Sequence, residues 1–474
     1  MYDRMQTLTQ EEMTRIHDAA MDLLGTTGIA FNEDEALTIF KKNGFKVDGK
    51  TVYFTEARVR NALSTAPSRF TVTARNPEKS VAVGGDDYVF VPGYGAPFIT
   101  LTSGLQREST MDDYDNFCKL VQTSRHINMN GFMMVEPSDV PADTAHLDMI
   151  FSSIILCDKP FMGSPVSKQG ARDCVDMAAV VWGGMDKLRA VGPVTVSLIN
   201  SLSPLQFSDE MAGSLIELAR ANQACVIASL IMAGSSGPVT LAGVLALQTA
   251  EILAGLTLAQ LVNPGAPVVY GSTSSAMDMK TGGLSIGCPE LSVVVSATAQ
   301  MARFYNLPSR SGGSLTDAHF PDAQAAVEST LALTTAARNG INFILHAAGI
   351  LGSYISMSYE KFLIDEEVCG ITRRLLKPME ITPGSIDTDM IKTVGIGGQY
   401  LTQPKTFQLC RTEFHLTDFM NRQNHAGWKA GGRKRIDEFA VDRLGQRLAR
   451  YEKPGIDPGV EAALADFVTR RKKG

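Results

Sequence analysis

The segments ACVIASLIM (224–232), PVTLAGVLALQTAEILAGLTLAQLV (238–262) and PVVYG (267–271) decide the fold class. The first and third are short apolar runs with β-branched residues, which is typical of buried strands. The long segment between them has the length and composition of a buried helix. A strand, a helix and a second strand in this order predict two parallel strands joined by a right-handed crossover.

This unit repeats along the chain. Seven apolar runs recur at intervals of about 30 to 45 residues. The runs are Met129–Val135, Phe161–Pro165, Val194–Ile199, Ala224–Met232, Pro267–Gly271, Ser309–Gly313 and Ile341–His346. Helical patterns alternate with them at Ala142–Leu156, Gly170–Trp182, Asp209–Ala221, Pro238–Val262, Glu290–Tyr305, Pro321–Asn339 and Ser358–Leu376. So many repeats predict an α/β protein with a (β/α)8 TIM barrel rather than an open sheet.

The barrel is expected over residues 110–379, between two segments whose predicted helices and strands do not alternate in this way. Residues 1–109 predict an N-terminal α+β extension, with helices at 8–25 and 55–66 followed by short strands after residue 70. Residues 380–474 predict a C-terminal helical segment that packs on the barrel or on a partner subunit.

Composition narrows the class of protein. The 474 residues include 44 Lys and Arg against 50 Asp and Glu, a net charge of −6 that argues against a nucleic-acid partner. The seven cysteines are widely spaced, which indicates reduced thiols rather than a disulfide framework or a zinc ribbon. Gln248, Glu251 and Gln260 interrupt the longest apolar stretch, and the first 20 residues lack a signal-peptide core. We therefore expect a cytoplasmic protein without a membrane partner.

Polar residues that follow the apolar runs are the candidate site residues, because the chemistry of these barrels lies at the carboxyl ends of the strands. They are Glu136, Asn200, Ser272, Asp317 and His346. Each also has a purely structural interpretation. Asn200 is then a turn residue, Asp317 orients its loop, and His346 is a core histidine bonded to the backbone. Ser272 belongs to a run of hydroxyl residues at one strand end.

Two tyrosines stand near the predicted mouth of the barrel. Tyr94 lies between two glycines in GYGAPF (93–98), and Tyr354 follows the His346 run. A pocket with aromatic rings and few charges suits a quaternary ammonium ion, through cation–π contacts of about 0.5–2 kcal/mol each. The alternative is that both rings only pack loops.

Other chemistries lack their motifs. No G-x-G-x-x-G follows a strand, and neither a phosphate-binding G-x-x-x-x-G-K-[ST] nor a nucleophile elbow G-x-S-x-G occurs. Cys288, Glu290 and His319 or His346 lack zinc-ligand spacing, so we expect no bound metal. A hydroxyl-rich lyase or hydrolase remains an alternative class.

Several motifs in one order resemble the trimethylamine methyltransferase family. They are SSGPVTLAGVLALQTAEILAG (235–255), NPGAPVVYGSTSSAMDMKTG (263–282), GCPE (287–290), GGSLTDAHFPDAQAAVE (312–328) and HAAGILGSYISMSYEKFLIDEE (346–367). The resemblance extends from about residue 8 to 430 and is strongest to members without pyrrolysine that use glycine betaine. The founding enzymes carry pyrrolysine at a position near 346–349. This chain has none, which disfavours trimethylamine as its substrate.

The resemblance implies a (β/α)8 barrel and an activity. A methyl group would pass from glycine betaine to the cobalt(I) of a cognate corrinoid protein, and dimethylglycine would be released. This chain would bind no cofactor itself, since it lacks the D-x-H-x-x-G cobalamin signature. His346 would serve in catalysis. The substrate would be bound by Tyr94, Tyr354, Glu136, Asn200, Ser272 and Asp317.

Two alternatives stay open at the level of function. In the first alternative, the methyl donor is another quaternary amine, carnitine or proline betaine. In the second, the chain binds betaines without turnover. Whether copies of the chain form a homo-oligomer also stays open.

Overall fold

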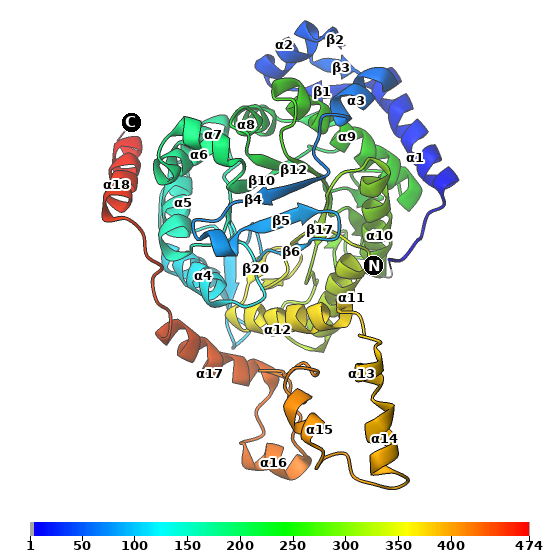
Figure 1. The fold of residues 1–474 in the computed structure, drawn as a ribbon. Coiled ribbons are helices and arrows are strands. Elements are labelled where there is room, and N and C mark those ends of the chain that lie inside the picture. Colours follow the sequence, from blue (N-terminus) through cyan, green and yellow to red (C-terminus); the bar gives the residue numbers. More distant parts are fainter. Residues whose placement is uncertain (1–3, 474) are drawn as a thin grey trace.

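The core of the molecule is a seven-stranded sheet in which every neighbouring pair is parallel (Figure 1). A computed structural model describes residues 4–473. The strand order is β6-β18-β17-β14-β12-β10-β9. The bounds are β6 (Val89–Phe90), β9 (Phe161–Met162), β10 (Thr195–Asn200), β12 (Ala224–Ser229), β14 (Val268–Ser272), β17 (Ser309–Gly312) and β18 (Phe343–Leu345). The predicted α/β class with parallel strands is confirmed.

Helices cover the outer face of this sheet, as crossover connections require (Figure 1). They are α4 (Met111–Thr123), α5 (Ala145–Leu156), α6 (Lys168–Trp182), α7 (Met185–Val191), α8 (Asp209–Arg220), α9 (Leu241–Val262), α10 (Pro289–Phe304), α11 (Ala323–Arg338) and α12 (Tyr359–Leu376). Helix α9 is long and apolar enough to cross a membrane, but most of it is buried inside the protein. Its apolar surface is buried between β12 and β14 on one side and helices on the other.

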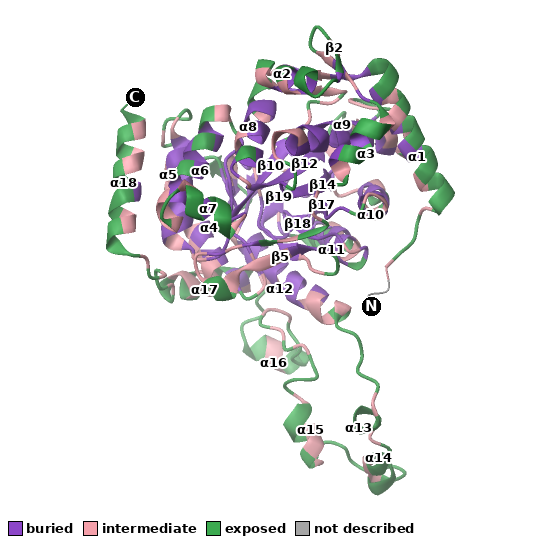
Figure 2. Cartoon of the chain, turned by 45° about the horizontal axis from the view of Figure 1, so that its top comes forward, coloured by how far each residue is buried: buried purple, intermediate pink, exposed green. Residues whose placement is uncertain are grey.

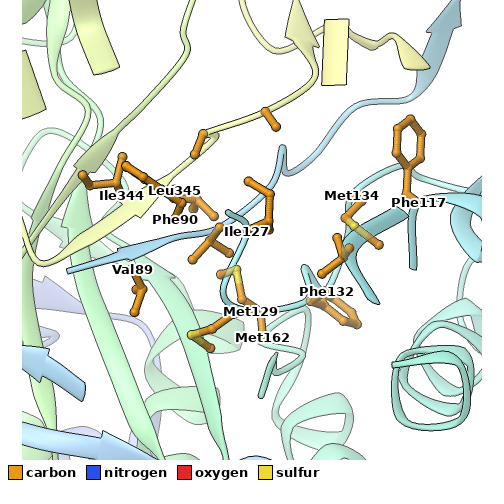
Figure 3. Close-up of a cluster of buried hydrophobic side chains, with 14 of the residues drawn as sticks. Val89, Phe90, Phe117, Ile127, Met129, Phe132, Met134, Met162, Ile344 and Leu345 are labelled. Carbon is orange, nitrogen blue, oxygen red and sulfur yellow. The ribbon is translucent and has the colours of Figure 1, made fainter. Parts of the chain in front are cut away.

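An irregular segment, residues 127–135, lies between the two edge strands β6 and β9. Asn128 N donates to Phe90 O at 2.8 Å, and Asn130 N donates to Pro160 O at 2.8 Å. The predicted strand Met129–Val135 is wrong as a regular strand, because only Asn130 and Val135 make single bridges. Its side chains are nevertheless buried, and Figure 3 shows Met129 and Ile127 beside β6 and Phe132 with Met134 toward α4.

The N-terminal residues share sheets with the rest of the chain. One small sheet joins β1 (Ile29–Phe31), β2 (Lys46–Asp48) and β3 (Thr51–Tyr53) to β11 (Gln206–Phe207), beside α1 (Gln10–Asp22), α2 (Asp34–Lys42) and α3 (Glu56–Leu63). A hairpin of β4 (Arg69–Val72) and β5 (Val81–Gly84) precedes β6. Since β6 itself belongs to the core sheet, the predicted limit at residue 109 does not coincide with a boundary of that sheet.

Small sheets also form among the loops that follow the core strands. One holds β13 (Met232–Ala233), β15 (Ser275–Met277) and β16 (Leu284–Ser285). Another holds β19 (Ile350–Leu351), β20 (Ser356–Met357), β7 (Phe98–Thr100) and β8 (Gln106–Glu108). We call this end of the core sheet, where the strands have their carboxyl ends, the mouth, and the opposite end the base.

The C-terminal region divides into two attached helices and a projecting arm. Helix α17 (Ile436–Ala449) packs on α12 and α4, and α18 (Pro458–Lys472) packs on α5 and α6. Arg447 pairs with Glu366, and Arg471 Nε lies 2.8 Å from Asp173 Oδ1. Residues 377–435, which we call the arm, carry only the short helices α13 (Pro383–Ile386), α14 (Thr388–Val394), α15 (Pro404–Leu409) and α16 (His425–Ala430). None of its residues is buried, and it extends from the body in Figure 2.

Candidate active site

A buried arginine stands at the mouth of the sheet. Arg310 is the second residue of β17, and only 2% of it is exposed. Its Nη1 donates to Thr273 Oγ1 at 3.3 Å, whereas its Nε has no hydrogen-bond partner. In the described part of the chain no carboxylate forms an ion pair with it. Burial lowers the pKa of Arg310 to about 10, so the side chain remains a cation at neutral pH.

An unpaired buried cation is costly, and proteins rarely keep one without a counterion. A guanidinium with free N–H groups is the side chain best shaped to bind a carboxylate through two parallel hydrogen bonds. The surroundings of Arg310 therefore favour a small ligand that brings a negative charge.

His346 lies beside this arginine, directly after β18. It is buried, and its backbone has a φ of 58°, which is uncommon for a residue other than glycine. Its ring centroid is 4.8 Å from that of Tyr354, and its Nδ1 has no hydrogen-bond partner. Burial, and then the charge of Arg310, hold the pKa of His346 well below its usual value. The imidazole is therefore neutral at neutral pH.

Two tyrosines complete the group. Burial raises the pKa of Tyr354 to about 12, while the Arg310 charge and the Thr273 hydroxyl act in the opposite direction. The pKa of Tyr94 is also raised by burial, and then by Glu136. The ring of Tyr94 lies 6.5 Å from that of Phe132, centroid to centroid. These rings place apolar, electron-rich surfaces close to a fixed positive charge.

A half-buried carboxylate, Asp317, holds the loops that carry these residues. Asp317 accepts hydrogen bonds from Ser285 Oγ at 2.8 Å, from Ile286 N at 2.8 Å and from Ser353 Oγ at 2.7 Å. It thereby ties the β16 loop to the residue before Tyr354. The positive φ of Tyr354, 79°, is thus fixed by a network that its neighbour joins.

A buried ion pair supports the turn after His346. Lys361 Nζ donates to Asp365 Oδ2 at 2.6 Å and to Ser329 Oγ at 2.8 Å. Asp365 Oδ2 accepts in turn from Gly349 N at 2.9 Å. The pair therefore connects α12 to residues 346–349, which follow β18.

The sequence-predicted residues divide into two sets. The structure brings His346, Tyr354 and Tyr94 together, with Glu136 next to Tyr94, where partial burial raises the pKa of its carboxyl. Asn200 is the exposed last residue of β10. The other two residues, Ser272 and Asp317, are hydrogen-bonded to neighbouring protein groups.

Ser272 and Asp317 make structural contacts. Ser272 Oγ donates to Gln248 Oε1 at 2.7 Å and accepts from Ser274 N at 3.0 Å. Asp317 is saturated by the loop contacts described above, which matches its purely structural interpretation.

The residues predicted from the sequence do not include Arg310, and they do not single out Thr273 within the run of hydroxyl residues after β14. Arg310 stands inside the run Ser309–Gly313, whereas the predicted site residues follow the runs. A charged residue in a strand otherwise made of serine and glycine was the signal that could have revealed it, because such a residue is rarely buried without a partner.

Within residues 4–473, no three His, Cys, Asp or Glu side chains are grouped as metal ligands would be. Cys288, considered above with His319, has its Sγ 3.3 Å from Ser275 Oγ. The arrangement instead suits the binding of a small molecule that carries both a negative and a positive charge.

Comparisons with known proteins agree with the resemblance. The family model described as trimethylamine methyltransferase matches residues 1–474. A glycine betaine methyltransferase of Desulfitobacterium hafniense is 46% identical over 98% of this chain and 97% of its own length. A proline betaine:corrinoid methyltransferase of Eubacterium limosum is 34% identical over 100% and 98%, and a trimethylamine methyltransferase of D. hafniense is 30% identical over 97% and 92%. The chain therefore belongs to the trimethylamine methyltransferase family.

Proposed function

We propose that this enzyme transfers a methyl group from glycine betaine to the cobalt(I) of a corrinoid carried by a separate protein, and releases dimethylglycine. The observation that carries the proposal is the unpaired, buried Arg310 beside the rings of Tyr354 and Tyr94. Glycine betaine has a carboxylate and a trimethylammonium group, which these two features match. The names of the relatives, a glycine betaine methyltransferase and a proline betaine:corrinoid methyltransferase, support the same reaction.

The substrate carboxylate would bind the Arg310 guanidinium, which directs the trimethylammonium toward the aromatic walls. A carboxylate keeps its charge throughout the reaction, so Arg310 binds ground state and transition state alike and serves to position the substrate. The aromatic contacts to the ammonium are weak, about 0.5–2 kcal/mol each, which avoids overstabilising a charge that disappears.

The chemical step needs no proton. The electron pair of cobalt(I) attacks one methyl carbon and forms a cobalt–carbon bond. The carbon–nitrogen bond breaks, and its electron pair stays on the nitrogen, which becomes the neutral amine of dimethylglycine. Opposite charges on cobalt and nitrogen partly cancel, so exclusion of water favours the transition state. A neutral His346 fits this scheme, because its buried ring contributes to the water-free wall without adding a second positive charge.

The remaining site residues take graded roles in this proposal. Glu136 adds negative potential next to Tyr94, which attracts the cationic end of the substrate. Thr273 orients the Arg310 guanidinium, and Asp317 positions the loop of Tyr354. Asn200 and Ser272 are assigned no direct contact with the substrate.

The fold supports a complete (β/α)8 barrel. With residues 128–130 as an irregular strand, eight strand positions follow one another from β6 around to β18, and β18 pairs with β6. The barrel then begins near residue 89 and ends with α12, and its N- and C-terminal neighbours pack around it.

The proposed reaction also indicates the partner protein and the cellular compartment. The methyl acceptor comes on a corrinoid protein, as the name of the E. limosum relative indicates. We place the enzyme in the cytoplasm, where its widely spaced free cysteines stay reduced. The exposed apolar arm favours a homo-oligomer.

A spectroscopic assay tests the proposal. Purified enzyme is mixed with cob(I)alamin and glycine betaine, and methylcobalamin formation is followed by absorbance, with proline betaine, carnitine and trimethylamine as parallel donors. Methylation with glycine betaine as the preferred donor is the expected result. Preference for another betaine would change the donor. Binding without turnover, also with a reduced corrinoid protein present, would contradict the proposed reaction.

A further inference from the structure

The loops at the mouth expose an unusual number of large apolar side chains. Eight of them are between 36% and 72% exposed, and they come from loops that follow seven different strands. We call this set the rim. It consists of Leu101, Leu105, Val166, Leu202, Leu230, Val239, Met279 and Ile355.

The same loops are poor in charge. The segments 93–105, 163–167, 201–206, 230–240 and 346–358 contain no Asp, Glu, Lys or Arg. The segments that enter the strands at the base differ, since six of them carry charged residues: Asp87, Lys159, Arg189, Arg220, Arg303 and Arg338. The two ends of one sheet thus have different surfaces, and only the mouth has the composition of an interface core, where charged residues are depleted.

Several charged groups also lie at the mouth, outside these segments. Asp278 accepts from Lys280 N at 2.7 Å and from Thr281 N at 2.9 Å in the turn between β15 and β16. Asp317 is saturated by loop contacts. Groups of the same loops thus hold Asp278 and Asp317, whereas Lys280 and Glu136 are exposed and lie outside the uncharged segments.

Part of the rim is a continuous patch. A Cβ added at Gly234 would lie 3.5 Å from Met279 Sδ and 3.8 Å from Val239 Cγ2. These side chains come from separate loops, one before α9 and one after β15, and meet over a glycine whose φ is 90°. An exposed patch assembled from distant loops is typical of a protein-binding surface.

We propose that the rim is the docking surface for the protein that carries the methyl acceptor. This inference rests on the proposed function, and it goes further by naming the contact residues and their chemistry. A betaine bound beside Arg310 and His346 cannot cover side chains on seven loops. The acceptor must approach that pocket through the mouth, so its carrier must rest on the loops that surround it. The recognised surface on the carrier is correspondingly apolar and neutral.

Charge introduced into the rim tests the proposal. Val239→Asp and Met279→Asp change exposed side chains outside the pocket, so the fold is expected to tolerate them. Val327→Asp, at an equally exposed valine on the outer face of α11, is the matched control. Each variant is assayed with glycine betaine and two acceptors, free cob(I)alamin and a reduced cognate corrinoid protein. Affinity for that protein in its cobalt(II) form is measured separately by biolayer interferometry.

The rim variants are expected to methylate free cob(I)alamin within twofold of the wild-type rate. Their KM and Kd for the corrinoid protein should rise at least tenfold, while Val327→Asp should change neither. Unchanged affinity for the corrinoid protein would overturn the docking assignment, as would a change only in the self-association of the enzyme. A wild-type enzyme that binds the corrinoid protein through the rim yet transfers no methyl group would refute the proposed function and leave the docking surface standing.

Discussion

At the scale of single residues, the site depends on the conflict between burial and charge at Arg310. A guanidinium taken out of water normally requires a paired carboxylate, and here its protein contact is one hydroxyl, Thr273 Oγ1. The Arg310 cation lies beside the neutral His346 ring, so the buried centre of the site carries a positive charge. Such a pocket selects an anionic group first and leaves the methyl-bearing end of the substrate among aromatic rings.

Replacement of Arg310 by methionine should raise the KM for glycine betaine about 10- to 100-fold, because a charged hydrogen bond contributes about 1.5–3 kcal/mol. Tetramethylammonium lacks a carboxylate, so its kcat/KM should be the same for both enzymes. Steady-state methylation of cob(I)alamin with the two donors measures this. Equal losses for both donors would mean that Arg310 only supports the pocket. Circular dichroism shows whether the variant is folded.

The depressed pKa of His346 makes stability depend on pH in the acid range. The folded protein resists protonation of this ring, whereas the unfolded chain protonates it near its ordinary value of 6.5. Its contribution to stability is therefore complete above pH 6.5 and is lost below it, by up to about 1.4 kcal/mol per pH unit. His346→Gln removes this contribution. Between pH 7.5 and pH 5.5 the melting temperature should decrease more for the wild type than for the variant. An equal decrease for both proteins would contradict the assignment.

These residues also show the limit of prediction from sequence. His346, Tyr354 and Tyr94 could be found because each follows or flanks an apolar run, where strands of a barrel present their chemistry. Arg310 could not be found by that rule, since it projects from within a strand. Nor does sequence reveal that Ser272 bonds to Gln248 while Thr273, one residue later, faces Arg310.

At the scale of elements, the helices were predicted better than the strands. Helices α6, α8, α9, α10, α11 and α12 lie within a few residues of the predicted segments, because long periodic patterns define them. The core strands are as short as two residues, and the segment 127–135 is irregular although its side chains are apolar and buried. The apolar composition of this segment was the reason for predicting a strand. The role of β6 in the core sheet depends on pairing with β18, about 250 residues away, which local patterns do not contain.

The contact between α12 and the turn after His346 depends on the buried pair Lys361–Asp365. Asp365→Asn keeps an acceptor for Gly349 N but leaves Lys361 without a counterion, so we expect a loss of about 3–5 kcal/mol in unfolding free energy. Chemical denaturation measures it. The double variant Lys361→Met with Asp365→Leu is the control and should recover much of the loss, because no buried charge remains. A single variant as stable as the wild type would show that the pair is dispensable.

At the scale of the whole molecule, the arm is the part that the single chain does not account for. Residues 377–435 contain no buried residue, yet they expose large apolar side chains. These include Met379, Ile381, Ile386, Ile391, Ile396, Leu401, Phe407, Phe414 and Leu416. The hydrophobic effect opposes so much apolar exposure on a monomer. Something must cover this surface.

The arm leaves the body at the base, away from the mouth. At the end of α12, Arg373 donates to His126 O at 3.2 Å and to Asn128 Oδ1 at 2.6 Å, next to the residues that enter the sheet. At its start, Glu360 accepts from Thr102 Oγ1 at 2.9 Å near the mouth. Eighteen helical residues separate these ends by about 27 Å. The arm thus begins at the end of α12 opposite the mouth, and in the homo-oligomer that we propose a second copy of the chain would cover it.

The full-length enzyme should therefore sediment at twice its 51.1 kDa mass or more at micromolar concentration. A variant with Ile396→Asp, Leu401→Asp and Phe407→Asp changes three strongly exposed side chains of the arm and should sediment as a monomer. Its methylation of free cob(I)alamin should persist, because the barrel and the Arg310 pocket lie outside the arm. Thr388→Asp with Gln399→Asp, at exposed polar positions of the same arm, adds charge without removing apolar surface and should leave the oligomer intact. A wild-type enzyme that is monomeric at this concentration, or an oligomer that survives the triple substitution, would contradict assembly through the arm.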